Sequence, residues 1–241
     1  MSNQNIQRKN HRRQISTSFS KVADRYDLLN DVMSIGIHRL WKRYAIELSA
    51  PRPGQVILDI AGGTGDLAAK LSRAVGNEGQ VFLADISSPM LQIGRKRFSN
   101  NKHASNIRYL QTDVENLPFE DNTFDCITIA MGLRNTPDKQ QALTSMTRVL
   151  KPGGRLLVLE YSTPTHPLVK KLIDRYTQTV VPFVSKLLLN DSQPLQSLTE
   201  SILTHPDQKA LKHMMRKAGL EQVEYHNLTQ GIVALHRGFK Y

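Results

Sequence analysis

Three aspartates stand at the ends of successive short apolar runs, where a ligand-binding site can form. Asp59 belongs to the run 56–60, Asp85 ends the run 81–85, and Asp113 follows the third run. If these runs are neighbouring parallel strands, their carboxyl ends meet at one edge of a sheet, which is where such folds bind ligands. One such aspartate could be an ordinary loop or cap residue, but three at successive positions indicate a shared site.

A glycine-rich segment, Gly62-Gly63-Thr64-Gly65, separates the first apolar run from a helical pattern. Glycine lets the backbone turn tightly and approach a ligand closely. Asp85 lies about twenty residues further on, where a carboxylate can accept hydrogen bonds from both hydroxyls of a ribose. A plain tight turn would also explain the glycines, so the surrounding residues decide.

Two cofactors fit this pattern, NAD and S-adenosyl-L-methionine. The segment 63–68 matches the dinucleotide fingerprint G-x-G-x-x-A. Asp59 favours the second cofactor, because its carboxylate would repel a pyrophosphate but bind the ammonium of an amino-acid group. Asp113 can accept from an adenine amino group, and the Lys151-Pro152-Gly153-Gly154 turn is typical of class I methyltransferases. We therefore expect S-adenosyl-L-methionine at a site that includes Asp59, Gly63, Thr64, Gly65, Asp85 and Asp113.

The elements that must position these residues alternate between strand and helix. Strand patterns cover 56–60, 81–85, 107–111, 124–130 and 155–160, and helix patterns cover 66–75, 89–97 and 138–150. This alternation predicts an α/β fold of the class I methyltransferase type, with a Rossmann-like, doubly wound, mainly parallel sheet.

Helical patterns also flank this alternation. N-terminal helices are expected within 19–50, and a helical region near 166–189 interrupts the alternation before a helix at 207–218 and strands at 222–227 and 232–237. We expect one domain over 19–241, with a helical lid inserted at about 166–206.

The charge balance points to solubility or to an anionic membrane surface. The formal net charge is +11, and residues 1–18 form a basic tail, expected to be mobile, that carries Arg8, Lys9, Arg12 and Arg13. Such a tail can dock on anionic lipid headgroups. Nucleic acid is not expected as a partner, because no RNA-recognition signature or zinc-finger spacing occurs. No metal ligand set is predicted.

The sequence shows neither a membrane span nor a secretory signal. The longest apolar stretch, near 180–189, is interrupted by Pro182, Ser185 and Lys186, and a span needs about 20 apolar residues. The single cysteine, Cys126, excludes an internal disulfide. We therefore expect a cytoplasmic protein, peripheral at most on the inner face of a membrane.

With these residues in hand, the chain resembles the ubiquinone/menaquinone biosynthesis C-methyltransferases, the UbiE family, over about 19–241. The most specific blocks are His38-Arg39-Leu40-Trp41-Lys42, Gly132-Leu133-Arg134-Asn135 and His205-Pro206-Asp207-Gln208. Further blocks are 26–31, 34–37, 58–66, 150–155 and 234–238. The glycine segment alone is shared by many methyltransferases.

The resemblance implies methyl transfer from S-adenosyl-L-methionine to a ring carbon of a polyprenylated benzoquinol or of demethylmenaquinol. It places Thr64, Asp85 and the Asp113-Val114 pair at the cofactor. Family members usually have asparagine at position 113 and serine at position 130, next to the cofactor, where this chain has Ala130. They also carry a Tyr-x-Tyr-Leu element where this chain reads Leu195-Gln196-Ser197-Leu198, which puts the choice of ring or tail in doubt.

C-methylation of a quinol needs a base, or a water held by polar residues, that withdraws a phenolic proton. Arg134 and Asn135 follow the fourth strand and are expected to stabilise a phenolate and to position a water. His38 is a third catalytic candidate. For substrate contact the candidates are Tyr26, Trp41, His205 and Asp207, although a structural histidine or a core aromatic residue is an equally simple interpretation.

Two other functions stay open at this point. One is methylation of a different membrane substrate such as a phospholipid amine, and the other is a non-catalytic subunit of a quinone-synthesis complex. A homodimer is also compatible with the sequence. The apolar face of Leu168, Val169, Leu172, Ile173 and Tyr176 in the lid could touch lipid or simply pack on the core.

Overall fold

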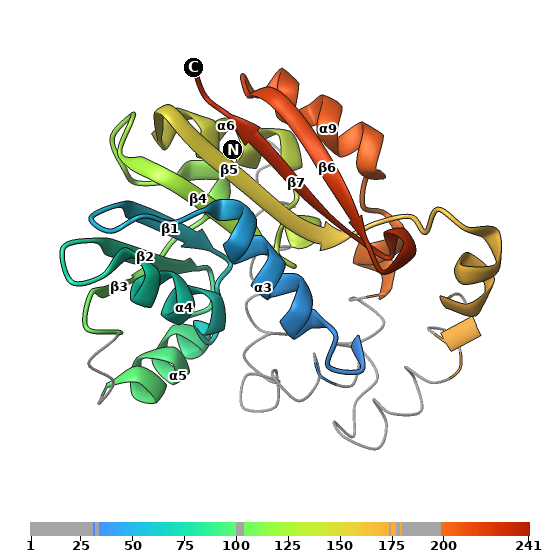
Figure 1. Cartoon of the computed structure of the whole chain (residues 1–241), viewed down its shortest axis with the longest axis horizontal. Helices are drawn as coiled ribbons and strands as arrows, with labels where there is room; N and C mark the ends of the chain where they lie inside the picture. Colours follow the sequence, from blue (N-terminus) through green and yellow to red (C-terminus); the bar gives the residue numbers. More distant parts are fainter. Residues whose placement is uncertain (1–30, 32–33, 100–103, 174, 177–178, 180–198) are drawn as a thin grey trace, which may run out of the picture.

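The computed structural model describes residues 31, 34–99, 104–173, 175–176, 179 and 199–241 (Figure 1). The basic tail, Tyr26, residues 180–198 of the predicted lid and the Leu195-Gln196-Ser197 segment lie outside the described residues.

A seven-stranded sheet forms the centre of the molecule, in the order β3-β2-β1-β4-β5-β7-β6 (Figure 1). Neighbours from β3 to β5 pair in parallel, whereas β7 pairs antiparallel with both β5 and β6. The strands are β1 Val56–Ile60, β2 Gln80–Asp85, β3 Ile107–Gln111, β4 Phe124–Ala130, β5 Leu150–Tyr161, β6 Glu221–Leu228 and β7 Val233–Phe239. The predicted mainly parallel sheet is confirmed.

Helices cover both faces of this sheet, as the doubly wound prediction requires. They are α3 His38–Ser49, α4 Asp66–Val75, α5 Ser88–Phe98, α6 Lys139–Val149 and α9 Gln208–Lys217. Short 3-10 turns are η3 Val114–Asn116, η4 Leu133–Asn135 and η5 Thr229–Gly231. Residues 167–173 are also helical, within the predicted lid.

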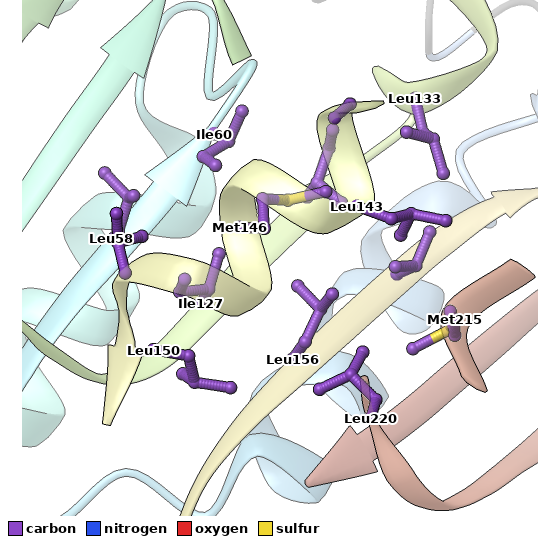
Figure 2. Close-up of a cluster of buried hydrophobic side chains, with 14 of the residues drawn as sticks. Leu58, Ile60, Ile127, Leu133, Leu143, Met146, Leu150, Leu156, Met215 and Leu220 are labelled. Atoms are coloured by element: carbon purple, nitrogen blue, oxygen red, sulfur yellow. The ribbon is translucent and has the colours of Figure 1, made fainter. Parts of the chain in front are cut away.

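Each face of the sheet has its own hydrophobic core. Figure 2 shows the first, where Leu143 and Met146 of α6 and Met215 of α9 pack against strand residues such as Ile127 and Leu156. On the other face α3, α4 and α5 pack over a second cluster that includes Trp41 and Leu71. The central strands are buried on both faces, which explains why they read as continuous apolar runs in the sequence.

The Lys151-Pro152-Gly153-Gly154 segment differs from the simple turn expected before the fifth strand. It lies inside β5, and the register jumps there: Phe124 pairs with Leu150, and Cys126 already pairs with Arg155. The extra residues form a bulge, and Gly153 adopts a φ of 77°. A bulge of this kind bends a strand while keeping it in the sheet.

The chain order creates a crevice beside β1. From β1 the chain runs outward through β2 and β3, and it then returns to the other side of β1 as β4 and β5. The loops after β1 and β4 therefore diverge at the carboxyl edge of the sheet, which is the usual ligand site of doubly wound folds.

Candidate active site

The loop between β1 and α4 needs a glycine at position 62. A Cβ built on Gly62 would lie 2.1 Å from Leu83 Cδ1 and 2.8 Å from Asp59 Oδ2. The Gly62 amide donates to Ala84 O at 3.3 Å, which ties the loop to β2. Gly65 has a φ of 87° and starts α4 from a left-handed conformation. The predicted glycine turn is therefore present, and its backbone can approach a ligand closely.

Asp59 is a buried carboxylate with one oxygen left for a ligand. It sits opposite Thr128 in the pairing of β1 with β4, and its Oδ1 accepts from Thr128 Oγ1 at 2.7 Å. Its Oδ2 is buried and has no hydrogen-bond donor among the described residues. Burial raises the pKa of Asp59 to about 7, against the opposing effects of Thr128 and Lys42. A cationic donor would satisfy this oxygen and favour the charged form.

Asp85, at the end of β2, is held firmly by two backbone amides. Gly63 N donates to its Oδ2 at 2.9 Å and Ser87 N donates to its Oδ1 at 2.8 Å. Burial raises its pKa, and these hydrogen bonds act in the opposite direction. A carboxylate has about four acceptor positions, so two remain for the paired hydroxyls of a ribose.

Asp113 and Val114 lie together at the start of η3. Asp113 Oδ1 accepts from Glu115 N at 3.0 Å and so caps this short turn. Both residues line the same pocket as Asp85, together with Met90, Thr112 and Pro137. An aromatic base can lie against Val114 and Met90 while Asp113 accepts from an amino group.

Two pockets meet at the carboxyl edge of the sheet. The first encloses about 760 Å³, including space open to solvent, and is lined by Gly63, Asp85, Asp113, Val114 and Asn135 among others. The second encloses about 550 Å³, again including space open to solvent, and is lined by His38, Lys42, Asp59, Ala61, Gly62, Thr64, Asp66, Leu67, Ala130, Met131 and Tyr161. Ala61 and Met131 line both pockets, so they mark the boundary between them.

The boundary residues have unusual backbones. Ala61 has a φ of 52° and Met131 a φ of 59°, the left-handed region that non-glycine residues rarely adopt. Such strain is common at functional sites, where the surrounding structure maintains it. Gly132 completes the boundary, because a Cβ there would lie 2.3 Å from the Cβ of Ala61.

Helix α3 supplies the basic side of the second pocket. His38 and Lys42 are one helical turn apart on this helix and both line the pocket. The Nδ1 of His38 lies 2.8 Å from Ser34 Oγ and 3.7 Å from Asp31 Oδ1. Burial and the charge of Lys42 lower the pKa of His38, which favours the neutral form of its imidazole.

Arg134 lies behind the boundary, in a buried ion pair. Its Nη1 donates to Glu160 Oε1 at 2.7 Å and also to Met131 O. Its guanidinium stacks on the Tyr161 ring with the carbon 5.2 Å from the ring centroid. Asn135 is placed differently, because it lines the first pocket directly. Arg134 thus contacts two residues that line the second pocket, Met131 and Tyr161.

Of the substrate candidates that the structure describes, Trp41, His205 and Asp207 line neither pocket. Trp41 is a core residue that donates from Nε1 to Thr229 Oγ1 at 2.8 Å and packs edge-on against Tyr161. Asp207 caps α9, accepting from Ala210 N at 2.8 Å. Neither ring nitrogen of His205 has a hydrogen-bond partner among the described residues, and burial lowers the pKa of His205 to about 4.

The His205-to-Gln208 block anchors the C-terminal part of the sheet. Gln208 Nε2 donates to Thr163 O at 2.8 Å and to Asn227 Oδ1 at 3.1 Å, which joins the end of β5 to β6. His236 of β7 contacts Gln208 O through Nε2 at 2.9 Å. Two blocks of the sequence far apart in the chain therefore meet here.

Sequence reasoning missed Lys42, Glu160 and Met131 as site residues. Lys42 belongs to the His38-Arg39-Leu40-Trp41-Lys42 block, and its spacing of four residues from His38 is the signal that places both side chains on one face of a helix. Glu160 ends an apolar strand, where a charged residue calls for a partner. Met131 carries no signal of its own in the sequence.

These residues fit S-adenosyl-L-methionine. The nucleoside would lie with Asp85, Asp113 and Val114, and the ammonium would satisfy Oδ2 of Asp59, a buried acceptor without a donor among the described residues. Ala130 lines the pocket next to Met131, as the resemblance implied, but offers no hydroxyl. Among the described residues no group of three His, Cys, Asp or Glu side chains could hold a metal ion.

Comparisons with known proteins identify relatives over almost the whole chain. The family profile described as the ubiE/COQ5 methyltransferase family matches residues 6–240. The ubiquinone/menaquinone biosynthesis C-methyltransferase UbiE of Pseudomonas fluorescens is 57% identical over 226 residues, which covers 94% of this chain and 88% of the relative.

Solved structures share the fold at low identity. A SAM-dependent methyltransferase of Aquifex aeolicus is 16% identical with a TM-score of 0.61, covering 83% of this chain and 89% of that one. Phosphoethanolamine N-methyltransferase 2 of Haemonchus contortus, solved with S-adenosyl-L-methionine, is 17% identical with a TM-score of 0.64, covering 83% and 52%.

Proposed function

The chain belongs to the ubiE/COQ5 methyltransferase family and is an S-adenosyl-L-methionine-dependent C-methyltransferase of ubiquinone or menaquinone biosynthesis, and we propose that its acceptor is a ring carbon of a polyprenylated quinol. The rings proposed are those of demethylmenaquinol and 2-methoxy-6-polyprenyl-1,4-benzoquinol. The observation that supports this is the meeting of two pockets at Ala61 and Met131. One is lined by the acids suited to a nucleoside, Asp85 and Asp113, and the other is lined by both Asp59 and His38.

The protein has two tasks in this reaction. Bound S-adenosyl-L-methionine supplies an activated sulfonium methyl, so the chain must align donor and acceptor and make the ring carbon nucleophilic. The rigid loop after β1 and the two amide bonds to Asp85 serve alignment. Removal of a phenolic proton serves the second task, because it increases electron density on the neighbouring carbon.

His38 is our candidate for the general base. Its imidazole lines the second pocket, burial lowers its pKa and so favours the neutral form, and Ser34 and Asp31 orient its Nδ1. That leaves Nε2 as the ring atom proposed to accept the phenolic proton. Asp31 Oδ1 lies 3.7 Å from Nδ1 and would stabilise the imidazolium that results.

Arg134 and Asn135 are proposed to act at the same edge in different ways. Asn135 lines the first pocket and can hold a water by its amide. Arg134 is proposed as a positioning residue, because its guanidinium is engaged with Glu160, Met131 and Tyr161. It would maintain the strained backbone of Met131, where donor and acceptor must meet.

A soluble quinol analogue tests the catalytic proposal. His38→Gln should lower the turnover number about 100-fold while leaving the affinity for S-adenosyl-L-methionine within about twofold, because the imidazole is assigned to the acceptor. His213→Gln, an exposed residue of α9, is the matched control and should leave both unchanged. Normal turnover in His38→Gln would remove this histidine from catalysis. Mass analysis of the product distinguishes methylation of a ring carbon from that of a phospholipid amine.

We also propose peripheral contact with an anionic membrane, which would bring the enzyme to a polyprenylated substrate. Leu168 and Leu172 are one turn apart in the helical segment 167–173 and are 63% and 68% exposed. The basic residues of 1–18 would add electrostatic attraction. No helix among the described residues has both the length and the apolar character that a bilayer crossing requires.

Vesicle flotation tests the membrane proposal. The full chain should float with anionic vesicles more than with neutral ones, and less at high salt, because a Debye length of about 8–10 Å screens the basic tail. Deleting residues 1–18 or replacing both leucines with serine should each weaken flotation without changing turnover on a soluble analogue. Equal flotation with neutral and anionic vesicles would contradict the electrostatic part.

A further inference from the structure

Lys42 is a mostly buried cation that the reaction described above does not use. Its side chain is 16% exposed, and it lines the second pocket together with Asp59 and Thr64. Its Nζ lies 3.2 Å from Asp66 Oδ2, at the first turn of α4. Burial of an ammonium group is costly unless the group is paired, and Asp66 provides that pairing in this structure.

Asp66 does not depend on Lys42 alone. Its other oxygen, Oδ1, lies 3.4 Å from the Nζ of Lys70, one turn along α4. The position in the first turn of a helix also favours a negative charge. Asp66 can therefore stay paired if Lys42 moves its ammonium toward a ligand.

The second pocket is lined by groups of opposite charge, with Asp59 and Asp66 as its acids and Lys42 as its lysine. Asp59 Oδ2 is a buried acceptor without a donor among the described residues, and Lys42 is a cation with an exchangeable partner. A free amino-acid group carries the complementary pair of charges, an ammonium and a carboxylate. A ligand that lacked its ammonium would leave Asp59 without an opposite charge, and a ligand that lacked its carboxylate would leave Lys42 paired only with Asp66.

We propose that Lys42 binds the carboxylate of the methionine end of S-adenosyl-L-methionine, exchanging its bond to Asp66 while Lys70 retains that aspartate. This inference rests on the cofactor assignment and adds a binding residue to it. Asp59 and Lys42 then select together for a zwitterionic amino-acid end. The enzyme should discriminate against nucleosides that have the same ribose and adenine but lack the carboxylate.

Calorimetry on the whole chain, with two ligands, tests the assignment. Wild type should bind S-adenosyl-L-methionine about 10- to 100-fold more tightly than decarboxylated S-adenosylmethionine. Lys42→Met should lose most of that preference, weakening the first ligand about 10- to 100-fold and the second by less than about threefold. Lys42→Arg should retain most of the affinity, because it preserves the cation.

Two further variants separate exchange from general damage. Lys209→Met removes an exposed lysine of α9 and should change neither affinity. Lys70→Met should weaken S-adenosyl-L-methionine by a smaller factor than Lys42→Met, about threefold to tenfold, because Asp66 then holds Lys42 more strongly. Urea unfolding confirms that each variant is folded.

The outcomes are distinct. If Lys42→Met weakens both ligands equally, or weakens neither, Lys42 does not bind the carboxylate and the proposal is overturned. If Lys42→Arg binds as weakly as Lys42→Met while remaining folded, a simple cation site is also excluded. Failure of the cofactor assignment looks different, because wild type itself would then bind neither ligand.

Discussion

Replacement of the buried Asp59 by asparagine should stabilise the protein and at the same time weaken cofactor binding. Burial raises the pKa of this carboxyl from 3.8 to about 7, while Lys42 and Thr128 lower it and Asp66 and Asp85 raise it further. The ionised form in the folded protein is therefore penalised by about 4 kcal/mol. Asparagine keeps the size and the acceptor for Thr128 but cannot ionise.

The pH dependence has a definite sign. In the unfolded chain Asp59 ionises near its ordinary pKa of 3.8, and in the folded chain near 7. Between these values the folded state binds more protons, so its stability falls as the pH rises and the full penalty applies above pH 7. Relative to Asp59→Asn, wild type should lose about 2–3 kcal/mol between about pH 5 and about pH 8.

Urea unfolding of the cofactor-free protein measures this difference, with the single Trp41 as the fluorescent probe. The new amide nitrogen, if it is buried without an acceptor, costs about 1–3 kcal/mol. This cost shifts the difference in free energy of unfolding between the two proteins by a constant amount and does not change how that difference varies with pH. Asp121→Asn is the control, because it makes the same replacement at a carboxylate that is 65% exposed.

A difference in stability that stays flat from pH 5 to pH 8 would refute the assignment of a raised pKa to Asp59. The same variant should bind S-adenosyl-L-methionine about 10- to 100-fold more weakly, because the ammonium loses its carboxylate. Opposite changes in stability and affinity separate a ligand-binding role from structural damage.

Three further predictions concern other parts of the molecule. Asp85→Ala should weaken S-adenosyl-L-methionine by about 2 kcal/mol or more, and titration calorimetry with unchanged affinity would remove Asp85 from the site. Arg134→Ala should lower the free energy of unfolding by about 3–5 kcal/mol, because it leaves Glu160 buried without its cation; Arg134→Met with Glu160→Gln should recover much of this loss in urea unfolding. Burial lowers the pKa of His236 to about 4, so its contribution to stability should be complete above pH 6.5 and should be lost as the pH falls toward 4. A proton titration of its ring by NMR that gives an ordinary pKa would contradict that last expectation.

Most of the fold could be predicted because the elements carry strong local signals. The β1, β3 and β4 bounds agree with the predicted runs. For β1 and β4 the signal is strong because parallel strands buried on both faces are almost continuously apolar. The bulge inside β5 could not be foreseen, because the pairing of Phe124 with Leu150 depends on how two strands align in space. Gly153 is typical of a turn because glycine readily adopts a positive φ, and the bulge in β5 uses the same left-handed conformation, with a φ of 77° at Gly153.

The residues proposed to bind the nucleoside could be predicted, because they stand at the ends of strands. The residues around the second pocket could not be predicted in this way. Asp85 and Asp113 stand at the carboxyl ends of two consecutive strands, β2 and β3. Because these strands are parallel neighbours, their ends lie at the same edge of the sheet. The pairing of Arg134 with Glu160 requires β4 and β5 to be neighbours, and no spacing rule reveals it. Asp207 had an available signal, because an aspartate just before a helical pattern is a preferred N-cap.

The contact between Ala61 and Gly132 constrains the order in which this sequence can change. Gly132→Ala alone would place its Cβ 2.3 Å from that of Ala61, so it should be rejected as a first step. Ala61→Gly removes the obstructing methyl and suits a φ of 52°, so it should be tolerated first and should open the way for alanine at 132. The two loops that border the pockets are therefore epistatic. Gly132→Ala, in the loop after β4, is expected to be tolerated only once Ala61→Gly has occurred in the loop after β1.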